Sequence, residues 1–123
     1  MEKNVKIAIV DSNLLSNSVR REALKSAGHV VRILPELAAA KAFVGMKAAT
    51  KIEAVICVET DSVQDDGIDW AKSLKIPVIL LTANDRKVEG FQTLERHDVS
   101  PKAIGDLLNI VGTIAAELAR KAA

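Results

Sequence analysis

Four short runs of apolar residues, rich in valine and isoleucine, divide the first two thirds of the chain. They lie at positions 5–10, 30–34, 54–59 and 77–82. Runs of this length and composition favour β-strands. The third and fourth runs are apolar at nearly every consecutive position, which is typical of strands that are buried on both faces.

Helical periodicity follows between these runs. Helices are expected over 14–27, 37–50 and 68–74. Gly28 predicts that the first of them ends in a left-handed residue. The apolar positions that would form the buried face of this first helix are Leu15, Val19, Ala23, Leu24 and Ala27.

A longer helix is expected over 101–120. Ser100 is suited to cap it, and Pro101 is suited to its first position, where no amide donor is needed. Its apolar stripe consists of Ile104, Leu107, Leu108, Val111, Ile114, Ala115 and Leu118.

Strands that alternate with helices of these lengths predict an α/β fold, with a doubly wound parallel sheet covered on both faces. Only 17 residues, 83–99, remain between the fourth run and the last helix. A helix of ordinary length and a strand do not both fit comfortably there. The spacing by three of Val88, Phe91 and Leu94 favours a short helix in this segment.

Composition narrows the classes of function. The chain of 123 residues, 49% hydrophobic and 27% charged, fits one domain over 3–123. A net charge of +1, with both signs interspersed, gives no electrostatic case for nucleic acid or an anionic membrane. The single cysteine, Cys57, excludes an intrachain disulfide, and no apolar run reaches the roughly 18 residues of a spanning helix. A cytoplasmic location is expected.

Polar side chains stand where three of the predicted strands end. Asp11 follows the first strand, Glu59 ends the third and Thr82 ends the fourth. In an open parallel sheet, ligands bind in the crevice outside the carboxyl ends of the strands, so these residues form a candidate site. Plainer interpretations stay open, with Asp11 as a turn residue and Thr82 as an ordinary strand residue.

Several motifs, in order, resemble the receiver domains of two-component response regulators. They are IVDSN at 9–13, LKSAGHVV at 24–31, the spacing from Glu59 to Gly67, PVILLTA at 77–83 and VSPKAIGDLL at 99–108. The resemblance covers nearly the whole chain and implies a five-stranded, flavodoxin-like sheet in three layers. The segment 83–99 is too short for the usual fourth helix, which is expected to be shortened or missing.

The resemblance also implies a site. In that family, two acids and an acceptor aspartate hold Mg²⁺, while a hydroxyl and a lysine bind phosphoryl oxygens. The corresponding positions here are Asp11, Ser12, Glu59, Thr82 and His97. Asp11 and Thr82 match the family. Ser12 replaces an acid, Glu59 replaces the acceptor aspartate and His97 replaces the lysine.

These changes predict a degenerate phosphoacceptor pocket. Ser12 removes one charge and leaves Asp11 and Glu59 as metal ligands, so Mg²⁺ binding should be weak or absent. Glu59 is one methylene longer than aspartate, which would move a phosphoryl group by about 1 Å from its in-line geometry. Glu59 could mimic a phosphorylated side chain by reaching toward Thr82, or it could belong to a site no longer used. Both interpretations stay open.

The expected function is therefore that of a pseudo-receiver, which is not an enzyme and acts mainly through protein–protein interaction. Its partner would be another protein or another domain of a larger signalling protein, with a homodimer through the last helix as one form. Two alternatives remain. One is a working phosphorelay receiver, with Asp61 as second-choice acceptor; the other is a small ligand-binding or enzymatic domain on the same fold.

Overall fold

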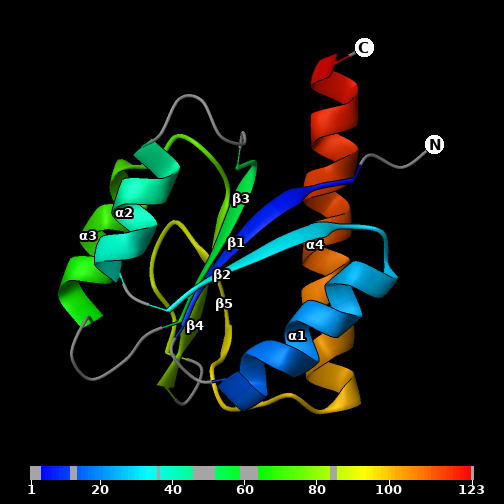
Figure 1. The fold of residues 1–123 in the computed structure, drawn as a ribbon, viewed down its shortest axis with the longest axis horizontal. Coiled ribbons are helices and arrows are strands. Elements are labelled where there is room, and N and C mark those ends of the chain that lie inside the picture. Colours follow the sequence, from blue (N-terminus) through cyan, green and yellow to red (C-terminus); the bar gives the residue numbers. More distant parts are fainter. Residues whose placement is uncertain are drawn as a thin grey trace.

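Five parallel strands form a single sheet. The structure, a computed structural model, describes residues 4–11, 14–35, 37–45, 52–58, 64–83 and 86–122. The strand order is β2-β1-β3-β4-β5, and every neighbouring pair is parallel (Figure 1). The strands are β1 (Lys6–Val10), β2 (Val30–Leu34), β3 (Ala54–Val58), β4 (Val78–Thr82) and β5 (Gln92–Glu95).

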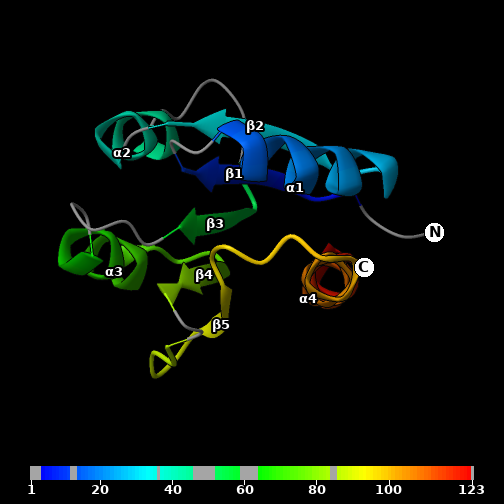
Figure 2. The ribbon, with the colours of Figure 1, turned by 90° about the horizontal axis from the view of Figure 1, so that it is seen from below.

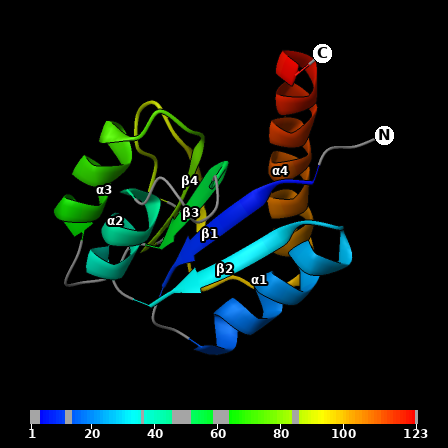
Figure 3. The ribbon, with the colours of Figure 1, turned by 45° about the horizontal axis from the view of Figure 1, so that its top comes forward.

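Helices cover both faces of this sheet (Figure 2). One face carries α2 (Leu37–Gly45) and α3 (Gln64–Ser73), and the other carries α1 (Leu14–Ser26) and α4 (Pro101–Ala122). Figure 3 shows α1 lying along β2. The predicted doubly wound α/β fold is confirmed.

The core consists of two apolar layers, one on each face of the sheet. In β1, Ile7 and Ile9 pack toward α1 and α4, whereas Ala8 and Val10 pack toward α2 and α3. All five positions of β3 and of β4 are buried. Each isoleucine that is fully buried in this way contributes about 1.5–3 kcal/mol. The buried central strands therefore fix the position of the carboxyl edge of the sheet, where the candidate site lies.

The predicted helix signals at Gly28 and Ser100 are confirmed. Gly28 has a φ of +95°, and the backbone amide of His29 donates to the carbonyl of Leu24. At the start of α4, the Ser100 hydroxyl accepts from the amide of Ala103 at 3.3 Å. Both helices thus begin or end where local chemistry satisfies otherwise unpaired backbone groups.

The predicted buried face of α1 is wrong in part. Leu15 is 79% exposed and Val19 is 36% exposed, whereas Asn17, Arg20 and Leu24 are at most 2% exposed. The buried residues follow the i, i+3, i+7 spacing of one helix face. This face turns inward because its polar members find partners at the carboxyl ends of the strands.

The short helix suggested by Val88, Phe91 and Leu94 is also wrong. Leu94 lies in β5, and the described residues 86–91 contain no helix. Val88 and Phe91 pack on the core layer beside α3, while Leu94 packs on the opposite layer. Extending the sheet satisfies backbone groups along β4 that a short helix would leave unpaired. The family's usual fourth helix was expected to be shortened or missing, and residues 86–91, which the structure describes, contain no helix.

Two element boundaries differ from the prediction. α3 begins at Gln64, four residues earlier than the predicted start at 68. The predicted second helix is observed as far as Gly45, and the remainder of its expected span, 46–50, lies outside the described residues. Among the residues that the structure describes, no helix combines the length and apolar character needed to cross a membrane.

Candidate functional site

The parallel strands bring three of the predicted site residues to one edge of the sheet. Asp11 follows β1, Thr82 ends β4 and His97 follows β5. The other two predicted site residues, Ser12 and Glu59, lie outside the described residues.

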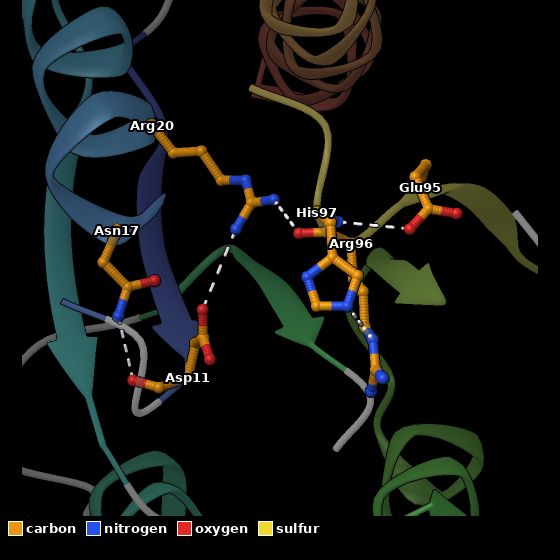
Figure 4. A network of polar contacts seen from close by, with 6 residues as sticks. All are labelled: Asp11, Asn17, Arg20, Glu95, Arg96 and His97. Atoms are coloured by element: carbon orange, nitrogen blue, oxygen red, sulfur yellow. Dashed lines mark hydrogen bonds and ion pairs between the residues drawn. The ribbon is translucent and has the colours of Figure 1, made fainter. Parts of the chain in front are cut away.

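Asp11 is almost completely buried, at 5% exposed, and is fixed by its backbone. Its amide donates to the carbonyl of Leu34 at 3.1 Å, and its carbonyl accepts from the Asn17 side-chain amide at 2.9 Å. The carboxylate points toward α1, where Oδ2 lies 3.8 Å from Nη1 of Arg20 (Figure 4). A buried acid next to a buried guanidinium is the central feature of the site.

Arg20 reaches from α1 into this edge of the sheet. Its side chain is only 2% exposed, and its Nη2 donates to the backbone carbonyl of Arg96, between β5 and α4 (Figure 4). Burial lowers the pKa of the Arg20 guanidinium, and the Asp11 carboxylate opposes part of that shift. Arginine keeps its charge in proteins, so the pocket holds a permanent cation.

The buried polar atoms that have no hydrogen-bond partner among the described residues include Nη1 of Arg20 and Oδ1 of Asn17. Such groups carry a desolvation cost of about 1–3 kcal/mol each.

Thr82 and His97 are engaged with their own surroundings. The Thr82 hydroxyl donates to the carbonyl of Arg86 at 2.8 Å, within the connection that follows β4. His97 is exposed, and its Nε2 accepts from Nε of Arg96 at 3.0 Å. The backbone amide of His97 also donates to the Glu95 carboxylate. The site therefore joins Asp11 to Arg20, while the hydroxyl and the imidazole have local partners.

Arg20 and Asn17 were missed by sequence reasoning. Polar residues on a helix are ordinarily assigned to its solvent face, and Leu15 and Val19 offered an apolar alternative. One signal was present: Asn17 and Arg20 share a helix face with Leu24, and the helix begins only three residues after Asp11.

The described side chains alone do not form a site for a divalent cation. Mg²⁺ and Mn²⁺ are held mainly by carboxylates and water, but the Asp11 carboxylate faces a guanidinium. Within the described ranges there is no group of three or more histidine, cysteine, aspartate or glutamate side chains that could hold a metal. Glu59, the other candidate ligand, lies outside those ranges.

A cavity of about 690 Å³ lies away from these residues, at the amino ends of β4 and β5. It extends between the end of α3 and the outer part of α4, and its lining includes Ile76, Val78, Phe91 and Ile110. Because Asp11, Thr82 and His97 belong to the opposite, carboxyl ends of the strands, we place the candidate site by its chemistry and not by this cavity.

No protein-family model matches the chain, and no curated protein matches its sequence. Solved structures do match. A CheY-like receiver domain from Methylobacillus flagellatus has a TM-score of 0.68 at 17% identity, covering 90% of this chain and 98% of that one. A response regulator from Thermotoga maritima has a TM-score of 0.67 at 16% identity, covering 92% and 98%.

The Mn²⁺-bound form of the response regulator Rcp1 also matches, with a TM-score of 0.62 at 18% identity, covering 89% of this chain and 91% of that one. Identities this low establish likeness of fold alone. The chain therefore has the flavodoxin-like fold of CheY-like response regulator receiver domains.

Proposed function

We propose that this domain is a pseudo-receiver, a signalling module that acts through protein–protein interaction and does not accept phosphate at Glu59. The observation that carries the proposal is the buried contact between Arg20 and Asp11. Phosphoryl transfer on this fold depends on a metal ion beside the acceptor carboxylate. Here the acid that should help to hold that ion already has a fixed positive partner.

Two further side chains support the proposal. The Thr82 hydroxyl donates to the carbonyl of Arg86, so it has a local acceptor in place of a phosphoryl oxygen. His97 occupies the position expected for lysine and is exposed, with its ring bonded to Arg96. Neither arrangement supplies the paired hydroxyl and ammonium that would bind a transferred phosphoryl group.

The partner would be another protein or another domain of a larger signalling protein. The apolar stripe of α4 packs into the core through Leu107, Val111 and Ile114. A homodimer through α4 would therefore use exposed side chains of this helix, such as Asn109 and Glu117. We assign no catalytic residue and propose that the domain is not an enzyme.

Treatment with acetyl phosphate and Mg²⁺ tests the proposal. We expect the intact mass to remain unchanged, because Arg20 opposes metal binding at Asp11 and Glu59 is one methylene longer than the aspartate that it replaces. A response regulator that takes phosphate under the same conditions serves as the positive control. A stoichiometric gain of one acid-labile phosphoryl group, at Asp11, Glu59 or Asp61, would instead establish a working phosphorelay receiver. Asp11→Asn, Glu59→Gln and Asp61→Asn variants would show which of the three carboxylates the reaction requires.

A further inference from the structure

The placement of Arg20 is unusual in energetic terms. A guanidinium that is 2% exposed loses its hydration, and burial of a charge is unfavourable unless other groups compensate for it. Compensation comes from two sides, the Asp11 carboxylate at 3.8 Å and the Arg96 carbonyl. The oxygen atoms of Asp11 and Arg96 therefore make this position favourable for a positive charge.

The contact with Arg96 extends the influence of Arg20 to other strands. Residues 20 and 96 are 76 positions apart in the chain. The amide of Arg96 donates to the carbonyl of Thr82 at 3.0 Å, while its carbonyl accepts from Arg20. The Arg20 side chain thus connects α1 to the ends of β1 and β5, and the backbone of Arg96 extends this connection to the end of β4.

We infer that Arg20 is the resident cation of this pocket: its guanidinium neutralises Asp11, connects the strand ends and excludes a divalent metal ion. The inference rests on the proposed function and explains why the domain would not accept phosphate. A divalent ion bound by Asp11 would lie close to a fixed positive charge in a poorly hydrated pocket, where repulsion is strong. Arginine does not lose its proton, so exclusion persists across the physiological pH range.

Mn²⁺ alone is the probe for this inference, with binding measured by electron paramagnetic resonance of the free ion. We expect no saturable binding to the unmodified protein and saturable 1:1 binding to Arg20→Met. Methionine retains an apolar stem and removes the charge. The double variant Asp11→Asn/Arg20→Met should lose the gain, because the ligand is then absent.

Arg21→Met is the matched control. Arg21 is the next residue of α1, but its side chain is 43% exposed and lies 3.7 Å from Glu22. The same loss of charge there should leave Mn²⁺ binding unchanged. If Arg20→Met fails to fold, Arg20→Gln removes the same charge and keeps an amide donor. Circular dichroism of each variant verifies that the variants being compared are folded.

Three results would overturn the inference: Mn²⁺ binding by the unmodified protein, no binding by a folded Arg20→Met or Arg20→Gln, or a gain that Asp11→Asn does not abolish. None of these depends on the phosphodonor experiment. A protein that takes no phosphate but fails the Mn²⁺ test would keep the proposed function and lose this explanation of it.

Discussion

Gly28 has a backbone conformation that a side chain would strain. Its φ is +95°, and a Cβ built there would lie 3.2 Å from Oδ1 of Asn4. We expect Gly28→Ala to lower the free energy of unfolding by about 1–2 kcal/mol, the cost of a left-handed L-residue. Urea denaturation monitored by circular dichroism measures the change.

Gly112 provides the opposite case. It lies in α4, and a Cβ there would meet nothing within 4 Å. Gly112→Ala should raise the free energy of unfolding by about 0.5–1 kcal/mol, because alanine favours a helix interior. Effects of the same sign at Gly28 and Gly112 would contradict the backbone explanation.

At this scale the sequence indicated part of the site. Asp11 and Thr82 were identifiable because they end apolar runs, and residues that end parallel strands meet at one edge. Arg20 was not, because its role depends on the carbonyl of Arg96, which is 76 positions away. A backbone carbonyl has no sequence signature, so the only local signal for Arg20 was the helix face that it shares with Asn17 and Leu24.

α1 is the element whose orientation most affects the site. If Asn17, Arg20 and Leu24 form its buried face, Leu24→Ala should lower the free energy of unfolding by about 2–5 kcal/mol. Leu15→Lys, at a position that is 79% exposed, should change it by less than about 0.5 kcal/mol. Leu24 belongs to both the predicted and the observed buried face, so thermal or urea unfolding of Leu15→Lys distinguishes the two faces, with Leu24→Ala as the buried reference. A larger loss for Leu15→Lys would restore the orientation predicted from the apolar pattern.

At the start of α4, Ser100 both caps the helix and forms a hydrogen bond with the carboxylate of Asp98. The Ser100 hydroxyl and then its backbone amide donate hydrogen bonds that lower the pKa of Asp98 below its ordinary 3.8, with a smaller contribution from Lys102. A lowered pKa stabilises the folded state above pH 3.8. That stabilisation is lost as the pH falls through the folded-state pKa.

Ser100→Ala tests both functions of this residue. We expect it to lower the free energy of unfolding by about 1 kcal/mol through loss of the cap. It should also move the pKa of Asp98 up toward 3.8, as followed by NMR titration. Ser73→Ala, at an exposed hydroxyl bonded to the carbonyl of Trp70, is the control and should leave that pKa unchanged. An unchanged Asp98 pKa in Ser100→Ala would show that the Ser100 hydroxyl caps the helix without lowering the pKa of Asp98.

The elements themselves followed from the sequence with one exception. Apolar runs located β1 to β4, because a strand buried on both faces needs consecutive apolar residues. The apolar pattern did not reveal β5, because its four residues, QTLE, are mostly polar, and only the family resemblance implied a fifth strand. Its place in the sheet comes from pairing with β4, where Leu81 lies opposite Leu94, and such pairing is invisible to a local pattern.

For the whole molecule, the order of strands and helices was enough to predict a doubly wound sheet, because parallel strands require crossovers and crossovers cover both faces. The missing helix before β5 followed from counting residues. The contacts that join α1, the end of β1 and the segment before α4 could not be predicted in this way, because they depend on a few side chains.

The parallel register also bears on how the chain reaches this structure. In a parallel sheet no two neighbouring strands are joined by a tight hairpin, so each pairing requires a long loop to close first. Such topologies fold more slowly than helical bundles of similar size. The bond from Arg20 to the Arg96 carbonyl spans most of the chain, so we place its formation late, after the central strands have assembled. We therefore expect the Arg20 contact to lower the rate constant of unfolding and to have little effect on the rate constant of folding.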